Sequence, residues 1–277
     1  MPAGARIGSL VFAKAASLAH VAQACNPFLR FSVNFSTAFL MAAMSEPALP
    51  RLILLPGLSG DETFFAPLLA ALRGRAEATV VTYPADRLLS YDALADHVAK
   101  ALPTAGAYAI IAESFGGPLA ILAASRAPNK PVAMVFAASF ATNPIPLLGL
   151  IMKTALSGFM ASKPIPVLEA MLLRPGDHMT ALHIFEAISA LPQNLVTARL
   201  DAIRKCDVRK SLAGLNMPML YLQGTKDKLM PAAQAVLMQR TAKNLRIIKL
   251  DRPHFVLQYE AEALVADVIA PFLQGLK

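Results

Sequence analysis

One serine in this sequence stands where it could act as a nucleophile. Ser114 lies in Ala112-Glu113-Ser114-Phe115-Gly116, at the point where a short apolar run gives way to a helix-like segment. A turn that lifts a serine oxygen clear of a strand needs small residues two positions before and after it, because strand and helix approach closely there. Ala112 and Gly116 meet that requirement. Serine also commonly caps helices, so the motif alone leaves both interpretations open.

A histidine must activate this serine, because a serine hydroxyl is a poor nucleophile until a neighbouring base removes its proton. His254 follows the last expected strand, in Asp251-Arg252-Pro253-His254-Phe255. Open parallel sheets form their sites at the carboxyl ends of the strands, so His254 is the expected general base. The remaining histidines fit a leader segment, the outer face of a helix and an inserted helical region: His20, His97, His178 and His183.

An acid that orients the histidine is expected after a different strand. Asp227 ends the turn Gly224-Thr225-Lys226-Asp227, which follows an apolar run directly. Taken alone, it is an ordinary turn aspartate. The order Ser114, Asp227, His254 along the chain, however, matches one known arrangement of a serine triad. Asp251 is a rival acid, but it lies only three residues before His254 and is less able to reach the imidazole.

Backbone amides beside Ser114 are expected to stabilise the negative charge that develops on an attacked carbonyl oxygen. Phe115 follows the serine and offers an N–H group at the start of a helix. The first core strand leads into Leu55-Pro56-Gly57-Leu58-Ser59-Gly60, whose flexible backbone can turn the amide of Leu58 toward the same point. A phosphate cradle is the alternative for this loop, but the Gly-x-Gly-x-x-Gly and Gly-Lys-Ser/Thr spacings are both absent.

Short apolar runs alternate with longer amphipathic segments from about residue 51, which is typical of a parallel sheet covered on both faces. The sequence therefore predicts an α/β fold with a doubly wound, mostly parallel sheet, interrupted by an inserted helical lid. The expected strands are 52–55, 79–82, 108–112, 132–136, 219–222 and 246–250, and the expected core helices are 65–72, 91–102, 117–127, one from about 231, and 260–273.

The 277 residues, 56% of them apolar, suffice for one enzyme-sized core. We expect this core to comprise 46–143 and 206–277, and the lid to comprise 144–205. Residues 1–45 contain basic residues but no Asp or Glu, and we expect a leader that is disordered, a targeting segment, or sequence upstream of the true start. No uninterrupted apolar run reaches the ~18 residues of a spanning helix, so no stable membrane span is expected.

Charge and cysteine usage exclude some classes of function. The formal net charge is +8, but the basic residues are dispersed and no zinc-knuckle spacing or aromatic ladder accompanies them, so nucleic-acid binding is not expected. Cys25 and Cys206 imply neither a disulfide framework nor a metal site. We expect a cytoplasmic protein unless the leader is a targeting segment, and the sequence leaves the oligomeric state open.

With these residues in view, the chain resembles the α/β-hydrolase superfamily over residues 51–273. Leu-Leu-Pro-Gly-Leu at 54–58 is similar to the family's oxyanion loop, with Pro56 in place of its histidine, and Ala-Glu-Ser-Phe-Gly at 112–116 is similar to its nucleophile elbow, with Ala112 in place of a glycine. Gly-Thr-Lys-Asp at 224–227 resembles the acid turn and Pro-His-Phe at 253–255 the histidine loop. The general likeness is to small lidded serine carboxylesterases, including methyl esterases that act on carrier-bound acyl chains.

The resemblance implies a serine hydrolase that cleaves carboxylic esters through an acyl-enzyme, with Ser114, Asp227 and His254 as catalytic triad and no metal or organic cofactor. A small acyl ester or thioester is the implied substrate. A thioesterase, a carbon–carbon bond hydrolase and a non-catalytic binding protein share this fold and remain alternatives. The lid residues that could line a pocket for an acyl chain are Leu147, Leu148, Ile151, Met152, Leu156, Phe159, Met160, Met171, Leu172, Leu173 and Phe185.

Overall fold

The computed structural model describes residues 49–144 and 162–276. The expected leader therefore lies outside the described residues, as do the expected lid residues between 147 and 160. Within the described part of the chain, no helix combines the length and the apolar character that crossing a bilayer requires.

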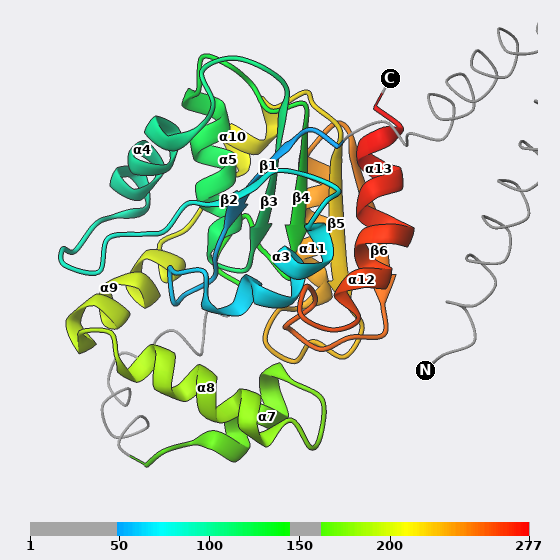
Figure 1. The fold of residues 1–277 in the computed structure, drawn as a ribbon. Helices are drawn as coiled ribbons and strands as arrows, with labels where there is room; N and C mark the ends of the chain where they lie inside the picture. Colours follow the sequence, from blue (N-terminus) through cyan, green and yellow to red (C-terminus); the bar gives the residue numbers. More distant parts are fainter. Residues whose placement is uncertain (1–48, 145–161, 277) are drawn as a thin grey trace, which may run out of the picture. The chain divides into compact units, whose positions relative to one another are not determined.

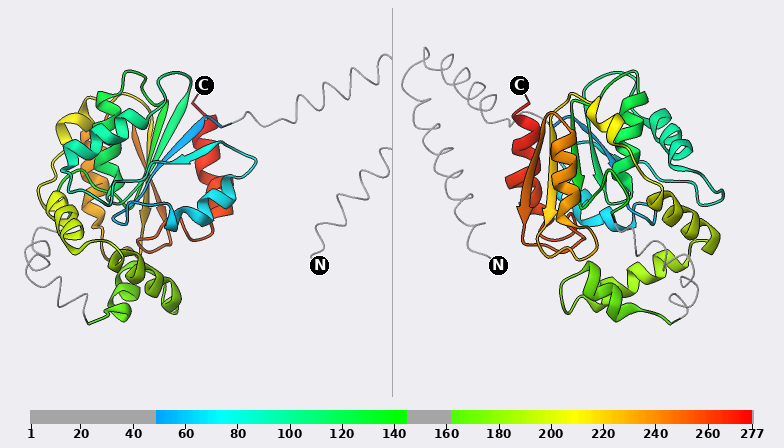
Figure 2. Two further views of the ribbon diagram at one scale, coloured as in Figure 1. Left: turned by 60° about the vertical axis from the view of Figure 1, so that its left-hand side comes forward. Right: turned by 180° about the vertical axis from the view of Figure 1, so that it is seen from behind.

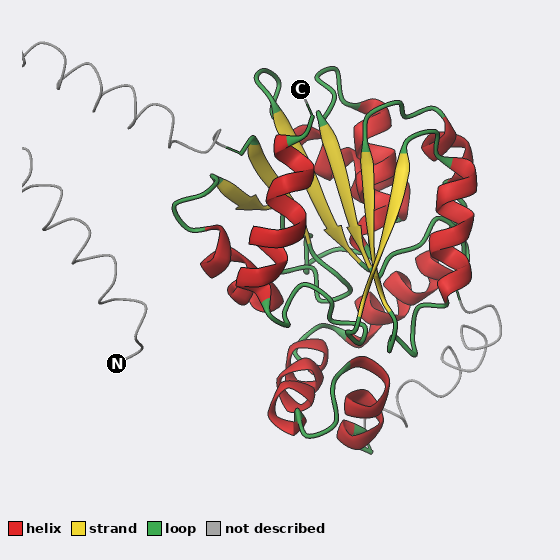
Figure 3. Ribbon diagram, turned by 90° about the vertical axis from the view of Figure 1, so that its right-hand side faces the viewer, coloured by secondary structure: helices red, strands yellow, loops and turns green. Residues whose placement is uncertain are grey.

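The core is a six-stranded sheet in which every neighbouring pair of strands is parallel, in the order β2-β1-β3-β4-β5-β6. This confirms the predicted α/β fold with a parallel sheet (Figures 1 and 3). The chain winds outward in both directions from the middle of the sheet, which makes the fold doubly wound. The strands are β1 (Arg51–Leu55), β2 (Ala78–Val80), β3 (Tyr108–Glu113), β4 (Ala133–Ala137), β5 (Met219–Gly224) and β6 (Leu245–Leu250).

Helices cover both faces of this sheet (Figure 2). One face carries α4 (Tyr91–Ala101), α5 (Gly116–Arg126), α10 (Arg209–Ala213) and α11 (Ala232–Thr241). The other carries η1 (Thr63–Phe65), α3 (Ala66–Leu72), α12 (Ala261–Leu264), η2 (Val265–Ile269) and α13 (Ala270–Gln274).

Strand β3 explains why the apolar runs in the sequence are continuous. Ile110 and Ala112 pack into the core beneath α4 and α5, whereas Ala109 and Ile111 pack into the core beneath α3 and α12. Successive side chains of a strand point to opposite faces. Because both faces are buried here, the first five residues of β3 are apolar or aromatic, and only its last residue, Glu113, is charged.

The C-terminal segment differs from the single helix expected over 260–273. It consists of α12, the π-helical turn η2 and α13 in succession. Pro271 has no N–H group to continue the i→i−4 ladder. The wider turn immediately before it accommodates that missing bond, so the segment remains helical without being a regular α-helix.

The described residues from 162 to 204 form the helices α7 (Ile165–Leu172), α8 (His178–Ser189) and α9 (Gln193–Arg204), without a strand. We call residues 144–205 the inserted segment. Figure 1 shows α7 and α8 beyond the carboxyl ends of the strands. The chain leaves after β4 and returns before β5, and a short antiparallel bridge between Thr142 and Asp207 joins the two ends.

Candidate active site

Ser114 occupies the turn between β3 and α5 in a conformation that side chains rarely adopt. Its φ is +47°, which is the left-handed region that costs a non-glycine residue energy. Its N–H donates to the carbonyl of Ala137 at 2.9 Å, and the Ser139 hydroxyl donates to its carbonyl at 2.8 Å. These bonds hold the strained turn in place. The N-cap residue of α5 is Phe115, with no side-chain capping bond, so Ser114 does not serve as a capping serine.

Gly116 is required by the close approach of this turn to the first strand. A Cβ atom on it would lie 2.6 Å from the carbonyl oxygen of Leu55 and 2.7 Å from that of Pro56. Backbone atoms of a central strand cannot yield at that distance. The small residue expected two positions after Ser114 therefore lets the turn at Ser114 lie against the end of β1 and the loop that follows it.

The structure brings Ser114, His254 and Asp227 into one hydrogen-bonded chain. The Nε2 atom of His254 lies 3.1 Å from the Ser114 hydroxyl oxygen, and its Nδ1 atom lies 2.9 Å from the carboxylate of Asp227. The other carboxylate oxygen of Asp227, Oδ1, accepts hydrogen bonds from the backbone N–H groups of Leu229 and Met230, each at 2.8 Å. The side chains of His254 and Asp227 are only 5% and 3% exposed. An acid held in this way fixes the imidazole with Nδ1 protonated and Nε2 free to accept a proton.

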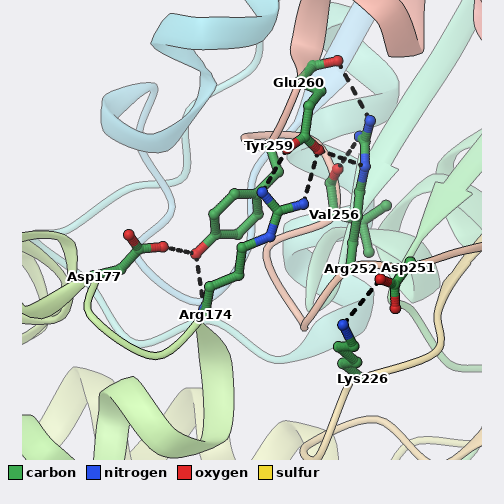
Figure 4. Close-up of polar contacts among 8 residues, drawn as sticks. All are labelled: Arg174, Asp177, Lys226, Asp251, Arg252, Val256, Tyr259 and Glu260. Carbon is green, nitrogen blue, oxygen red and sulfur yellow. Dashed lines mark hydrogen bonds and ion pairs between the residues drawn. The ribbon is translucent and has the colours of Figure 1, made fainter.

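The turns that carry the acid and the histidine pack directly on one another. A Cβ atom on Gly224 would lie 2.5 Å from the carbonyl oxygens of both Arg252 and Pro253, so the approach depends on glycine. The rival acid Asp251 pairs with a lysine, and the imidazole contacts Asp227 instead. Its side chain is 75% exposed and lies 2.9 Å from Lys226 Nζ. Figure 4 shows this ion pair.

The other histidines of the described residues, His97, His178 and His183, take no part in this arrangement. The ring of His97 contacts the backbone carbonyl of Thr82, His178 lies 3.4 Å from Glu169, and His183 is exposed. His20 lies outside the described residues.

The two expected oxyanion donors belong to backbone that flanks Ser114. Phe115 begins the first turn of α5, where N–H groups have no helical partner. Its ring is fully buried and stacks on Tyr91 with centroids 4.7 Å apart. On the other side, a Cβ atom on Gly57 would lie 3.8 Å from the Cβ of Ser114, so the loop that carries Leu58 adjoins Ser114.

An ion-pair network joins the histidine loop to the turn between α7 and α8 (Figure 4). The guanidinium of Arg174 donates to both carboxylate oxygens of Glu260, at 2.5 and 2.9 Å. Glu260 also faces Arg252 at 3.4 Å, and Arg252 is buried and donates to the carbonyl of Val256. Tyr259 donates its hydroxyl proton to Asp177 and accepts the N–H of Arg174. The helices of the inserted segment are thus attached to the residues that follow His254.

The comparisons with known proteins agree with this architecture. A model of the alpha/beta hydrolase family matches residues 52–268. The chain belongs to this family. The membership confirms the resemblance found between residues 51 and 273.

Solved structures of other alpha/beta hydrolases superpose on most of the chain. The enol-lactonase from Burkholderia xenovorans has a TM-score of 0.67 at 18% identity, covering 83% of this chain and 93% of that one. An esterase from Exiguobacterium antarcticum has a TM-score of 0.66 at 14% identity, covering 81% and 92%. At these identities the likeness concerns the fold alone.

A curated relative shares more sequence with this alpha/beta hydrolase. The polyketide synthase ThaQ of Burkholderia thailandensis is 31% identical in an alignment of 248 residues that covers 80% of this chain. The chain spans only 12% of the length of that relative, so the likeness concerns one part of a much larger protein.

A buried carboxyl group directly before Ser114 is not indicated by the sequence motifs. Glu113 is buried at the end of β3 and accepts a hydrogen bond from Gln258 Nε2 at 2.9 Å. Burial raises the pKa of Glu113 to about 7, although the hydrogen bond from Gln258 and the proximity of His254 lower it. The signal in the sequence is a charged residue that closes the apolar run 108–112, since such a residue must find a buried partner.

Proposed function

We propose that this alpha/beta hydrolase cleaves carboxylic esters through an acyl-enzyme formed on Ser114. The observation that carries the proposal is the hydrogen-bonded chain from Ser114 through His254 to Asp227, at the carboxyl edge of the sheet. Hydroxyl, imidazole and buried carboxylate in this order are the groups needed to activate a serine at neutral pH.

Each group has a defined task in the proposed reaction. The Ser114 oxygen attacks the ester carbonyl carbon while His254 Nε2 takes the hydroxyl proton, and Asp227 stabilises the imidazolium through Nδ1. His254 then gives the proton to the departing alkoxide, which leaves an acyl group on Ser114. A water molecule, deprotonated by His254 in turn, releases the acid. The amides of Leu58 and Phe115 would bind the oxyanion, and such donors contribute about 3 to 4 kcal/mol each.

An apolar cluster next to the triad supports an acyl substrate. The rings of Phe64 and Phe255 meet edge to face, 5.3 Å apart, and Phe255 directly follows His254. Leu172 and Ile184 of the inserted segment are buried in the same cluster. Apolar side chains of this kind accommodate hydrocarbon chains. Members of the cluster that were expected in a lid are Met171, Leu172 and Leu173. A role of the inserted segment as a lid over the acyl group is part of the proposal.

The proposal is tested by replacing Ser114 with alanine and measuring the hydrolysis of p-nitrophenyl esters. We expect kcat to fall by about 10⁴-fold or more, as for the loss of a serine nucleophile in other hydrolases. Ser125→Ala is the matched control, because Ser125 is exposed on α5 and its hydroxyl donates to the backbone carbonyl of Leu122, away from the triad. Undiminished turnover by purified Ser114→Ala would refute the assignment.

Thioester cleavage is the second candidate, and the similarity to part of a polyketide synthase favours it. A polyketide-like acyl chain would then be the substrate class, with the same triad acting on a thioester. Matched ester, thioester and diketone substrates with one acyl chain separate the candidates, because the kcat/KM values rank the three bonds directly. Failure of a fluorophosphonate probe to label Ser114 would instead indicate a non-catalytic binding protein.

A further inference from the structure

Arg199 of α9 is a buried cation without a carboxylate partner in the described part of the chain. It is 1% exposed, the largest of the fully buried side chains, and no described carboxylate forms an ion pair with it. A guanidinium remains charged in proteins, and a buried charge is tolerated only where other groups replace its hydration. The groups that replace water around the guanidinium therefore indicate the role of Arg199.

The partners of Arg199 are backbone carbonyl oxygens of two loops. Nη1 donates to Leu58 at 2.7 Å and to Ser59 at 2.8 Å, and Nη2 donates to Pro84 at 3.3 Å. The guanidinium also lies 5.9 Å from the ring centroid of Tyr83. An arginine from the inserted segment is therefore bonded to the loop that carries the expected oxyanion donor Leu58.

Every carbonyl of that loop, residues 56–60, is hydrogen-bonded. Tyr83 holds both ends, because its hydroxyl donates to Pro56 at 2.9 Å and its N–H donates to Gly60 at 2.7 Å. The N–H of Gly60 donates to Gly57 at 3.2 Å. Among the residues that the structure describes, Arg199 is the hydrogen-bond donor to the remaining carbonyls, those of Leu58 and Ser59. Without its guanidinium these two oxygens would lose their partners.

These bonds determine where the amide of Leu58 points. The peptide unit between Gly57 and Leu58 is planar and trans, so its N–H and C=O groups point in opposite directions. Its carbonyl is turned toward the N–H of Gly60, and the next carbonyl is turned toward Arg199. The N–H of Leu58 is directed away from Gly60, in a loop segment that adjoins Ser114 at Gly57.

We propose that Arg199 is a positioning residue of the reaction, which fixes the loop 56–60 so that the Leu58 amide is oriented for the oxyanion before substrate binds. This inference rests on the proposed function. Arg199 does not touch the reacting atoms and acts through the two carbonyls it holds. Donors oriented in advance are effective because no reorganisation is needed as the charge develops.

The space for the guanidinium depends on Gly60. A Cβ atom there would lie 2.7 Å from Nη1 and 2.9 Å from Nη2 of Arg199, and Gly60 has a φ of +78°. Gly74 is the matched control, because its φ is +77° but nothing lies within 4 Å of the position of a Cβ atom. Alanine at either position brings the same backbone strain, and only alanine at 60 displaces the guanidinium.

The first test compares Arg199→Lys and Arg199→Met with the wild type on a p-nitrophenyl ester. We expect Arg199→Met to lower kcat by about 10- to 100-fold, somewhat less than the removal of a whole oxyanion donor, with KM within about twofold. Arg199→Lys keeps the charge but reaches fewer carbonyls, so its kcat should fall between the two. Arg204→Met is the control on the same helix, because Arg204 pairs only with Asp201, and its kcat should match the wild type.

The second test measures transition-state binding directly. A trifluoromethyl ketone adds reversibly to the serine oxygen and places an oxyanion where the proposed donors lie. The Ki of this inhibitor should rise by the same factor as kcat/KM falls across Arg199→Lys, Arg199→Met and Gly60→Ala, because a transition-state analogue reports the same lost interactions. Gly74→Ala should leave both values unchanged. A change in thermal stability alone would not produce this proportionality.

Each outcome of these two tests supports or overturns the positioning role of Arg199. Equal losses in kcat/KM and inhibitor affinity, confined to the Arg199 variants and Gly60→Ala, would establish the positioning role. Folded variants that turn over like the wild type, or that raise KM alone, would overturn it while leaving the triad assignment intact. A wild-type enzyme that neither turns over esters nor reacts with fluorophosphonate would overturn both. If Arg199→Met does not fold, Arg199→Lys and Gly60→Ala decide the question.

Discussion

Single residues at the ends of the strands determine how closely the reactive groups meet. Ser114, Asp227 and His254 were expected from residue type and from their places after strands, and the structure joins them by hydrogen bonds. Gly116 and Gly224, near these residues, allow backbone segments to approach closely. Gly224 lets the turn that carries Asp227 pack on the carbonyl oxygens of Arg252 and Pro253. The distance between Asp227 and His254 therefore depends on the absence of a side chain at this position.

Replacing Gly224 with alanine should therefore separate the acid turn from the histidine loop. We expect kcat to fall by about 100-fold, because a displacement of about 1 Å in a catalytic geometry has an effect of that size. Steady-state kinetics on a p-nitrophenyl ester measures the effect. Gly214→Ala is the control, since a Cβ there would lie 3.4 Å from its nearest neighbour, Ser211 O. Wild-type kcat in Gly224→Ala would show that the two turns can shift without consequence.

The contacts of Arg199 could not be predicted from residue types in the sequence. Leu195, Val196 and Arg199 share one buried face of α9, and an arginine at that spacing is a signal of a buried cation. Its partners, however, are backbone carbonyls of a loop 140 residues earlier in the chain. Every residue has a backbone carbonyl, whatever its side chain. No sequence motif could therefore have indicated this contact. The same holds for the bond from Gln258 to the Phe64 carbonyl.

At the scale of elements, the strands were predictable because burial on both faces leaves a continuous apolar run. The expected strand 219–222 corresponds to β5 (Met219–Gly224) and the expected helix 91–102 to α4 (Tyr91–Ala101). The C-terminal helix was predicted as continuous, but its π-helical turn depends on how Pro271 is accommodated. How α7 and α8 attach to the core was not predictable either, because the attachment joins side chains of Arg174 and Glu260 that lie 86 residues apart.

Arg174→Met should loosen that attachment. Because the Arg174 and Glu260 side chains are 39% and 48% exposed, the pair contributes no more than about 1 kcal/mol. We expect KM for a long acyl ester to rise by about two- to fivefold, in keeping with that energy, and KM for an acetyl ester to stay constant. Kinetics over a series of chain lengths tests this.

Arg75→Met is the matched control for Arg174→Met, because it removes a comparable exposed arginine–glutamate pair, with Glu262, that does not involve the inserted segment. An equal rise in KM for short and long esters in Arg174→Met would contradict a link between α7, α8 and the acyl group.

At the scale of the whole molecule, Glu113 connects the site to the stability of the fold. Its pKa of about 7 lies above the ordinary value of 4.5, chiefly because burial disfavours the charged form. Between these values the native state binds more protons than the unfolded chain. The free energy of unfolding therefore decreases as the pH rises from about 4.5 to 7, and the contribution of Glu113 is constant above that window.

Glu113→Gln should remove this pH dependence. The difference in unfolding free energy between variant and wild type should rise by about 3 kcal/mol from pH 4.5 to pH 8, in favour of the variant. Its amide can also donate to Gln258 Oε1, which is buried and has no partner among the described residues. Urea unfolding at several pH values measures the difference. A difference that stays constant over this pH range for Glu113→Gln would contradict the raised pKa.

The antiparallel bridge at Thr142 and Asp207 closes the inserted segment at its base. The N–H of Val208 also donates to the carbonyl of Ala141, and that of Asn143 to the carbonyl of Cys206. β4 and β5 are neighbours in the sheet. The pairing of these two strands therefore does not depend on how many residues are inserted between them. Under the proposed function, a helical segment of different size inserted at the same place would change the acyl group that the enzyme prefers, while the hydrogen bonds among Ser114, His254 and Asp227 stayed in place.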